Sequence, residues 1–484
     1  MAIQPLELTI VIVYLVGMLL IGYLTNKLSI KNSTDYLIAG RRMGLFMVAC
    51  SLSANNVGGG STTGLAARAF SSWGMSAAWY VLAAAVAMIP LAFFAPKIRK
   101  TMAVTIPEVL QRRYGKAPST ITAVLNIISL FCLTSSQVMA SGSVVNSLTG
   151  IPMNVCIIIA GLVVILYTTM GGMMADTITD VVQYIIIFIG LAVAVPFVMN
   201  GIGGMEKLSE MLPPVEMDFF KVGWVTILGL IFNYFCTFMS GPEMISRFES
   251  AKDEKSAMGA SLLSGVMMAS IAFFPTLIGL AAKAVNPALN DGAGTSALTW
   301  ATSQYAPPFI SGLLSAAIIA ATMSSADSNL LCASTMLVKD IFLKFSKKKI
   351  DDKQIITITR ISNIGICVMS MCIAFAGVSL VTMNLFAFAL RSAGPFAAYA
   401  LGLACPKATP KTGMASIIVG SVGAVAWQLA GQPFGILAIV FGCFVGTAAF
   451  LITWAIEKSQ GVAPAPSAFL TEDEMAALEK VENV

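Results

Sequence analysis

The segment Ser53-Ala54-Asn55-Asn56-Val57-Gly58-Gly59-Gly60-Ser61-Thr62-Thr63-Gly64 interrupts an otherwise apolar run of the chain. Each glycine costs about 1 kcal/mol relative to alanine inside a helix, and the two asparagines add polar groups that a bilayer does not solvate. Unwound backbone at membrane depth is tolerated only where it lines a polar cavity or is buried in protein. The segment predicts a broken membrane helix, and a glycine-rich packing face against a neighbouring helix is the alternative.

The composition of the 484-residue chain indicates that a bilayer surrounds this segment. Hydrophobic residues make up 57% of the chain and charged residues 11%, whereas soluble domains carry roughly 25% charged residues. Nine cysteines are scattered singly and there is no histidine, which argues against a disulfide framework and removes the commonest metal ligand. No nucleophile with an adjacent base is visible, so we expect neither an enzyme nor an organic cofactor, and no nucleic-acid partner.

About thirteen apolar segments are long enough to cross a bilayer as helices. They are residues 7–26, 44–70, 75–96, 119–147, 152–170, 176–199, 222–245, 257–283, 307–335, 354–377, 380–402, 412–431 and 434–455. Basic residues concentrate in the odd-numbered connections, which places the N-terminus outside and the C-terminus in the cytoplasm. We therefore expect an all-α polytopic protein of the bacterial inner membrane, whose first segment is a spanning helix and not a cleaved signal peptide.

A second interruption, Ser240-Gly241-Pro242, lies five spans after the first. Proline ends or kinks a helix, and interrupted helices in corresponding positions of two halves indicate a transporter binding site. The spacing predicts two five-helix repeats of opposite orientation. The predicted parts are a peripheral first helix with a cytosolic loop (1–43), the first repeat with helices 2–6 (44–200), the second repeat with helices 7–11 (201–403), peripheral helices 12–13 (404–456) and a cytosolic tail (457–484).

A few charged side chains fall inside the predicted spans. Ser324, Asp327 and Ser328 share one helix face because they are spaced i, i+3 and i+4. Such oxygen groups suit an alkali cation, and interhelical hydrogen bonding is the alternative. Asp180, taken by itself, is an acid in the first turn of a helix. Arg391 has three possible partners: a substrate carboxylate, an internal acid or the membrane interface.

Several motifs in the same order resemble the sodium:solute symporter family, which includes proline, pantothenate, sialic acid and sugar symporters. The resemblance covers roughly residues 5–455. It rests on Ser51-Leu52-Ser53-Ala54-Asn55-Asn56-Val57, Gly171-Gly172 with Thr179-Asp180-Val181-Val182-Gln183, Ser324-Ser325 with Lys339-Asp340-Ile341, and the stretch from Arg247 to Lys252. It implies the leucine-transporter-like inverted-repeat fold with breaks in helices 2 and 7.

The same resemblance implies where the coupling ion binds. The shared sodium site would comprise carbonyl and hydroxyl oxygens of Ala54, Val57, Ala321, Ser324 and Ser325. Some members have a second, inner sodium site, which here would comprise Asp180, Ser324, Asp327 and Ser328. The family position at Asp327 is often small or a hydroxyl, so a carboxylate there either strengthens a second ion or replaces it.

The substrate is expected near the midplane, between the two breaks. The candidate substrate-binding residues are Asn56, Ser61, Tyr80, Gln137, Phe235, Phe238 and Arg391. Sugar-selective members have more polar residues around these positions. The more apolar wall expected here favours an amino acid or a carboxylate over a sugar.

The leading functional hypothesis is sodium-coupled symport of a small organic solute into the cell by alternating access. A proton-coupled symporter of the same fold, using Asp180 or Asp327 as the proton carrier, is the main alternative. A membrane sensor would need a signalling module larger than the tail, and a channel would not need two interrupted helices. The expected partners are the solute, the sodium ion and the bilayer, and a monomer suffices for this function.

Overall fold

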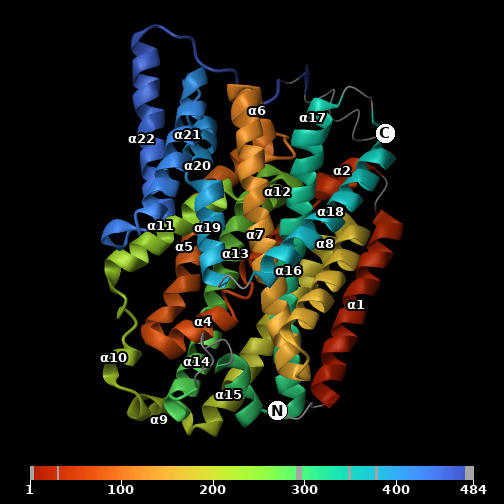
Figure 1. Cartoon of the computed structure of the whole chain (residues 1–484), viewed down its shortest axis with the longest axis vertical. Helices are drawn as coiled ribbons and strands as arrows, with labels where there is room; N and C mark the ends of the chain where they lie inside the picture. The colour runs from red at the N-terminus through yellow and green to blue at the C-terminus, as the bar shows by residue number, and fades with distance from the viewer. Residues whose placement is uncertain are drawn as a thin grey trace.

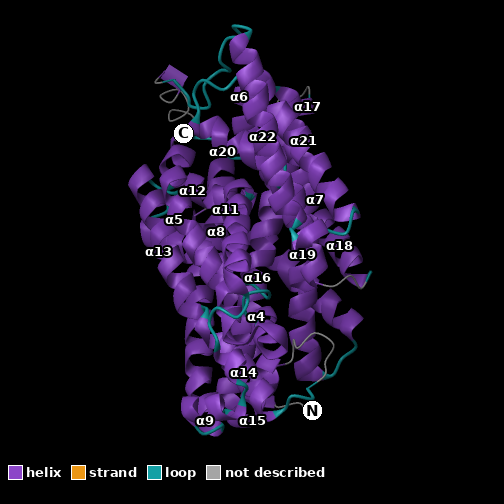
Figure 2. Ribbon diagram, turned by 90° about the vertical axis from the view of Figure 1, so that its left-hand side faces the viewer, coloured by secondary structure: helices purple, strands orange, loops and turns teal. Residues whose placement is uncertain are grey.

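The computed structural model describes residues 5–29, 32–289, 297–346, 350–376, 380–471 and 473–474. Its described residues are helical apart from connecting loops and one isolated parallel bridge, as Figures 1 and 2 show. Most of the predicted cytosolic tail beyond Thr471 lies outside the described residues.

The described helices follow one another with short connections. The longer ones are α1 (Pro5–Ser29), α3 (Leu45–Asn56), α5 (Trp79–Lys100), α7 (Lys116–Thr149), α8 (Met153–Gly201), α11 (Gly223–Ser240), α13 (Glu254–Ile271), α14 (Phe273–Val285), α16 (Pro308–Met336), α18 (Asp352–Phe375), α19 (Leu380–Ser392), α20 (Pro395–Ala404), α21 (Pro410–Leu429) and α22 (Ala438–Ser459). The shorter ones are α2 (Ser33–Ile38), η1 (Ala39–Arg41), α4 (Thr63–Arg68), η2 (Ala69–Trp73), η3 (Gly74–Ala78), α6 (Ile106–Tyr114), α9 (Gly204–Met211), α10 (Pro214–Met217), α12 (Pro242–Ser250), α15 (Ala297–Tyr305), η4 (Leu337–Phe342), α17 (Leu343–Phe345) and η5 (Pro433–Gly435).

Ten helical segments of the described residues are long and apolar enough to cross a membrane, or up to eleven if the bent pair of residues 386–392 and 395–404 counts as one. The chain is therefore a multi-pass α-helical membrane protein. By this measure α3, with 12 residues, is too short to count, and α8 counts once although it has 49 residues. The predicted number of thirteen spans stays a prediction.

Helix α8 bends at Gly172, between two of the predicted spans. Gly172 has φ 56° and ψ −165°, which is a backbone conformation that suits glycine. A Cβ atom there would lie 2.6 Å from Cδ2 of Tyr36. The bend and the close approach of α2 explain why glycine stands at this point of the chain.

Helix α16 runs through the centre of the molecule (Figure 1) and packs against α8, α7 and α1. Nearly every residue from Ser311 to Met336 is buried. Because the stretch from Ser311 to Met336 is almost wholly buried, its serines and its acid are surrounded by protein groups. α21 and α22 pack mainly against each other, at the opposite side of Figure 1 from α1.

Two helices stop inside the molecule. The helix α3 ends at Asn56, the chain turns through residues 57–62, and α4 begins at Thr63. The helix α11 ends at Ser240 and α12 begins at Pro242 after one extended residue, Gly241. Both stops coincide with the glycine-rich and Gly-Pro segments of the sequence.

Main-chain hydrogen bonds connect the ends of these two helix pairs. The N–H of Met43, just before α3, donates to the carbonyl of Ser250 at the end of α12 (3.1 Å). The N–H of Lys252 donates back to the carbonyl of Met43 (2.9 Å). We call this pairing the main-chain joint.

Candidate functional site

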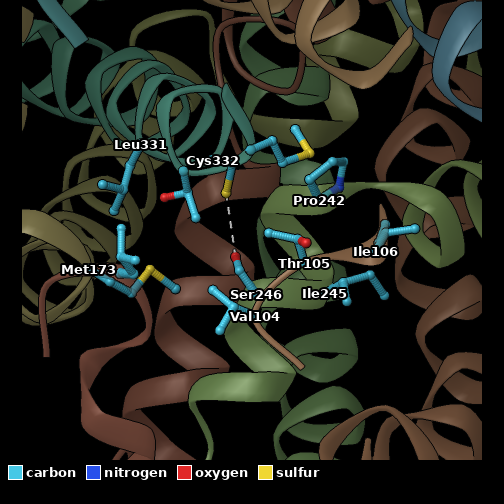
Figure 3. Close-up of a pocket in the computed structure, with 12 residues that line it drawn as sticks. Val104, Thr105, Ile106, Met173, Pro242, Ile245, Ser246, Leu331 and Cys332 are labelled. Carbon is cyan, nitrogen blue, oxygen red and sulfur yellow. Dashed lines mark hydrogen bonds between the residues drawn. The ribbon is translucent and has the colours of Figure 1, made fainter. Parts of the chain in front are cut away.

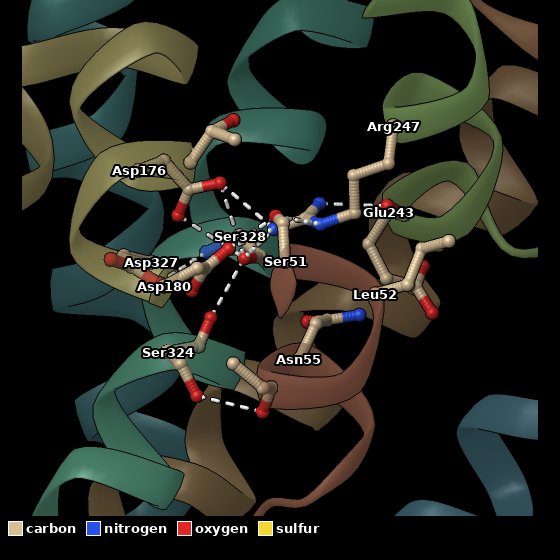
Figure 4. A network of polar contacts seen from close by, with 12 residues as sticks. Ser51, Leu52, Asn55, Asp176, Asp180, Glu243, Arg247, Ser324, Asp327 and Ser328 are labelled. Carbon is tan, nitrogen blue, oxygen red and sulfur yellow. Dashed lines mark hydrogen bonds and ion pairs between the residues drawn. The ribbon is translucent and has the colours of Figure 1, made fainter. Parts of the chain in front are cut away.

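The end of α3 meets α16 through uncharged oxygen atoms. The Oγ of Ser324 donates to the carbonyl of Ala54 (2.9 Å), and the Oγ of Ser325 donates to the carbonyl of Asn55 (2.7 Å). Both hydroxyls also lie near the carbonyl of Ala321, at 3.0 and 3.2 Å. Four of the five residues predicted for the main sodium site are thereby brought together. Figure 4 shows Ser324 facing the end of α3.

These oxygens form a donor set that fits an alkali cation. Carbonyl and hydroxyl oxygens are hard ligands. Each serine hydroxyl donates its proton to a carbonyl, so lone pairs of the hydroxyl oxygen remain available to a cation. Ser324 and Ser325 are buried, so few waters compete for these positions. Val57, the fifth predicted residue, is buried at the start of the turn with its N–H bonded to the carbonyl of Ser53 (2.9 Å).

The glycines after Val57 let the turn approach its neighbours closely. A Cβ on Gly58 would lie 2.7 Å from the Oγ of Ser325, and one on Gly59 would lie 3.0 Å from the Cβ of Ala140. The N–H of Gly59 donates to Oε1 of Gln137 on α7 (3.3 Å). The lack of side chains thus permits the contact between the turn and α16.

A charged cluster built around Arg247, in the last turn of α12, lies beside this contact (Figure 4). The guanidinium of Arg247, 1% exposed, forms ion pairs with Asp176 (2.8 Å) and Asp180 (3.2 Å) on α8. It also donates to the hydroxyl of Ser51 (2.8 Å) and to that of Ser328. Arg247 therefore connects α12 to α3, α8 and α16.

The predicted second sodium site coincides with this cluster. Of its four residues, Asp180 and Ser328 contact the Arg247 guanidinium directly. Asp327 accepts from the N–H of Ser328 (2.8 Å). One Oδ of Asp327 and one of Asp180 are buried without a hydrogen bond from the described residues. A protein cation already occupies part of the space that the resemblance assigns to a second ion.

A polar cavity of about 70 Å³ adjoins the other side of the α3 turn. It is lined by Asn55, Asn56, Gly58, Gly60, Ser61, Tyr80, Leu133, Gln137, Tyr234, Thr237, Phe238, Glu243, Ser325, Asn329, Asn384, Phe388 and Arg391. This volume holds a few water molecules. Six of the seven predicted substrate residues line it. The expectation of a more apolar wall is wrong, because most of these side chains are polar.

Phe235 is the predicted substrate residue that the structure does not bring to the cavity. Its ring packs against Phe94 (centroids 6.1 Å apart) and Phe396 (5.7 Å). Phe238, nearly one turn further along α11, faces the cavity instead, and its ring lies 5.4 Å from that of Tyr234. The sequence placed both aromatic residues on the cavity side of α11, and the helix turns one of them away.

Arg391 has an internal acid as its partner. One of its nitrogens, Nη1, lies 2.7 Å from each carboxylate oxygen of Glu243. Both side chains are buried and both line the cavity. Of the three partners that the sequence left open, the structure selects the internal acid. Glu243 is the functional candidate that the sequence reading missed, although its position after Gly241-Pro242 in an apolar run could have indicated it.

On the other face of α12, side chains almost fill the space. A void of about 10 Å³ remains among residues that include Leu37, Thr105, Ile245, Ser246 and Cys332 (Figure 3). The hydroxyl of Ser246 lies 3.5 Å from the Sγ of Cys332 across it. A void of that size is too small to hold a solute.

Comparisons with known proteins agree with this architecture. The model of the sodium:solute symporter family matches residues 36–420. The osmoregulated proline transporter OpuE of Bacillus subtilis is 26% identical over 92% of this chain and 94% of its own. The high-affinity proline transporter PutP of the same organism is 28% identical over 86% of this chain and 90% of its own.

Solved structures share the fold. A sodium-coupled sialic acid symporter in a substrate-bound outward-open state superposes with a TM-score of 0.84 at 22% identity, covering 96% of this chain and 99% of that one. A nucleobase-cation-symport-1 family transporter in a closed conformation has a TM-score of 0.57 at 17% identity, covering 88% and 95%. The family model spans well over half of the sequence, and this chain belongs to the sodium:solute symporter family.

Proposed function

We propose that this protein couples sodium entry to uptake of a small organic solute, an amino acid or a carboxylate in preference to a sugar, across a bacterial inner membrane. The observation that carries the proposal is the contact between the end of α3 and the serine pair of α16. Uncharged, buried oxygens of Ala54, Asn55, Ala321, Ser324 and Ser325 converge there from two helices. Proline transporters among the relatives agree with a small zwitterionic or carboxylate solute.

In this proposal sodium binds at Ala54, Val57, Ala321, Ser324 and Ser325. The ion draws on carbonyl dipoles and hydroxyl lone pairs and leaves no new unpaired charge on the protein. Because the ligands come from both α3 and α16, the bound ion stabilises the arrangement in which the two helices are joined. The solute cavity adjoins the same α3 turn and shares Ser325 with the ion site, which couples the two binding events.

We infer that one sodium ion, and not two, moves in each cycle. The Arg247 guanidinium contacts Asp180 and Ser328, where a second ion would bind. Each sodium entering down 100 mV supplies about 2.3 kcal/mol before its concentration gradient. A single ion therefore provides more than a tenfold accumulation of solute from the voltage alone.

The topology belongs to the same proposal: thirteen spans, an N-terminus outside, and inverted repeats over residues 44–200 and 201–403. A helix of 49 residues is roughly 74 Å long at 1.5 Å per residue, whereas the hydrocarbon core is roughly 30 Å thick. Splitting α8 at Gly172, and counting α3 and the α19–α20 pair as spans, brings the ten apolar segments to thirteen. The interrupted pairs α3–α4 and α11–α12 then stand at corresponding positions of the two repeats.

The test measures thermal stability of the purified protein in sodium and in equimolar potassium or choline. We expect a sodium-specific rise of the melting temperature in the wild type and in Ser334→Ala. Ser334 is a buried serine on α16 whose hydroxyl, among the described residues, donates to the carbonyl of Leu331 in its own helix (2.9 Å). Ser325→Ala should abolish the rise. The rise in Asp327→Asn should equal that of the wild type if one ion binds, and should be smaller if a second ion contributes.

A proton-coupled symporter is the second candidate, and it is favoured by one buried carboxylate oxygen on each of Asp180 and Asp327 that has no hydrogen bond within the described part of the chain. A carboxyl group in such a place binds either a cation or a proton. The absence of any sodium effect, together with a pH-dependent stability that Asp327→Asn removes, would contradict sodium coupling and support this second candidate.

A further inference from the structure

The cavity lining includes one buried negative charge and one buried positive charge, and each lies beside a different helix interruption. Glu243 lies in the first turn of α12 and Arg391 in the last turn of α19, just before α20. They are 5% and 1% exposed, and both belong to the cavity lining. Nearby, the hydroxyl of Ser240 donates to that of Ser392 (2.9 Å), so the same two interruptions are also held by an uncharged bond.

The ion pair leaves much of the arginine unused. Both oxygens of Glu243 accept from the single nitrogen Nη1, although a guanidinium has five N–H donors arranged to hold a carboxylate by two parallel bonds. The Nε of Arg391 is buried without a hydrogen-bond partner among the described residues. The buried Oδ1 of Asn55 and Oγ1 of Thr237, from residues of the same lining, have no partner there either.

Buried polar atoms without partners are costly, and a ligand that supplies the missing bonds recovers that free energy. A carboxylate fits the free edge of the Arg391 guanidinium. Once it binds there, Glu243 faces a second negative charge and needs a cation of its own. An ammonium group a few ångströms from the carboxylate provides it, and its remaining hydrogens can be donated to oxygens such as Oδ1 of Asn55.

We propose that Glu243 and Arg391 recognise a zwitterionic amino acid by charge exchange: the solute carboxylate pairs with Arg391 and the solute ammonium pairs with Glu243. The cavity is neutral before binding and neutral after it, so no unbalanced charge is buried. This inference rests on the proposed transport function and specifies the solute class of that same cavity.

Other solute classes lack this balance. A monocarboxylate would place an extra negative charge beside Glu243, and a simple amine would place an extra positive charge beside Arg391. A sugar brings neither charge and would leave the existing ion pair in place. The cavity volume of about 70 Å³ further limits the solute to a small amino acid, with some widening of the cavity on binding.

The competing explanation is that the ion pair only braces the two interruptions. Loss of a purely structural ion pair would lower stability and affect the binding of all solutes alike, whereas loss of a recognition pair would change the preference among solutes. The experiment therefore measures a ratio. Solute-dependent thermal shifts of the full-length protein in sodium are recorded with the protein amino acids, and the tightest-binding one is compared with its deaminated acid and its decarboxylated amine.

We expect the wild type to prefer the amino acid over both analogues by at least about tenfold, since each analogue lacks one charged hydrogen-bonding group. Glu243→Gln should reduce the preference over the deaminated acid about tenfold or more. Arg391→Gln should reduce the preference over the amine by a similar factor. Ser392→Ala, which removes only the uncharged bond between the interruptions, should leave both ratios unchanged.

The sodium-induced shift without solute reports whether each variant is folded with an intact ion site. If a single variant fails this check, two other variants replace it. They are Glu243→Asp, which keeps the charge, and the double variant Glu243→Gln/Arg391→Gln, which leaves neither charge unpaired. Unchanged ratios in a folded variant, or a wild type that binds an analogue or a sugar more tightly, would overturn charge exchange. Loss of the sodium shift in the wild type would instead contradict the proposed function.

Discussion

The two interrupted helix pairs face the same cavity with opposite chemistry. The α3–α4 turn presents carbonyls and glycines and meets uncharged serines of α16. The α11–α12 interruption is followed by Glu243 and Arg247, which form buried ion pairs with Arg391 and with two aspartates. The first region has free lone pairs and no charge, whereas the second has charges that are already paired.

This difference indicates how each region binds. An uncharged oxygen set takes up a cation by simple addition, and it releases the ion without leaving a buried charge unpaired. A paired region binds by exchange, because a ligand must replace a partner that is already present. The same fold thus separates a site suited to an ion from one suited to a solute that carries both charges.

The largest effect should come from the charged region. Arg247→Met leaves Asp176 and Asp180 buried without their cation, and breaking a buried pair in this way costs about 3–5 kcal/mol. We expect a large fall in melting temperature at neutral pH, measured by thermal unfolding in detergent. Arg247→Lys keeps the charge but loses the planar donors, and should lie between the methionine variant and the wild type.

If Arg247→Met were as stable as the wild type, the two aspartates would be neutral, and the contrast between the two regions would disappear. The uncharged control for this measurement is Ser334→Ala, which removes a bond within α16 alone.

A smaller effect is expected in the uncharged region. A Cβ added by Gly58→Ala would lie 2.7 Å from the Oγ of Ser325, so the hydroxyl must move from its place near the end of α3. Loss of one such bond costs about 1 kcal/mol, which lowers the sodium affinity roughly fivefold. Titration of the thermal shift with sodium measures it.

Gly64→Ala is the matched control, because its Cβ would meet only the carbonyl of Gly59, at an ordinary 3.4 Å. An equal loss of sodium affinity in both variants would show that any added side chain in this segment weakens sodium binding, and that the position of the Ser325 hydroxyl is not the cause.

The smallest effect is expected at η3, which follows α4 and η2 in the chain and is contacted by an ion-paired glutamate. Glu216 in α10 packs on Gly74 of η3 and forms ion pairs with Lys221 (2.9 Å) and Lys283 (3.0 Å). Partial burial raises the pKa of Glu216, but hydrogen bonds and charge from the two lysines outweigh it and hold the pKa below its usual range. A lowered pKa stabilises the fold above the unfolded value of about 4.3.

Glu216→Gln should therefore lower the melting temperature slightly at pH 7, by the equivalent of at most about 1 kcal/mol. The difference from the wild type should shrink as the pH falls below about 4, where the native carboxylate takes up its proton. A difference that stays constant from pH 7 to the acid range would show that packing on Gly74, and not charge, provides the stabilisation.

The contact between the end of α3 and the serine pair of α16 was predicted because its signal is local, and the binding of sodium there stays a prediction. Consecutive glycines after Asn56 identify a helix end, and the Ser324-Ser325 pair within an apolar run identifies a polar face. The resemblance then paired these segments, and the structure brings Ala54, Ala321, Ser324 and Ser325 together. The membership in the family and the all-helical membrane fold were also predicted correctly.

The charged region was predicted poorly because its partners are distant in the sequence. Glu243 and Arg391 are 148 positions apart, and no local pattern connects them. Arg247 was noted as the start of a stretch that carries the family resemblance, but it is buried beside Asp180, which lies within α8 and not in a first turn. Asp176, one turn before Asp180, shares its helix face, and that spacing was the available signal for a paired acid site.

The main-chain joint between Met43 and the end of α12 has a consequence for how this protein tolerates mutation. Its two hydrogen bonds use only peptide atoms, so every amino acid except proline, which lacks the N–H, can stand at Met43 or Lys252 without removing them. The exposed side chain of Lys252 is therefore free to vary, whereas the buried side chain of Met43 is constrained by packing and not by these two bonds. Main-chain bonds do not require particular amino acids, so an alignment of related sequences would not reveal this joint. The joint nevertheless connects the two interrupted helix pairs.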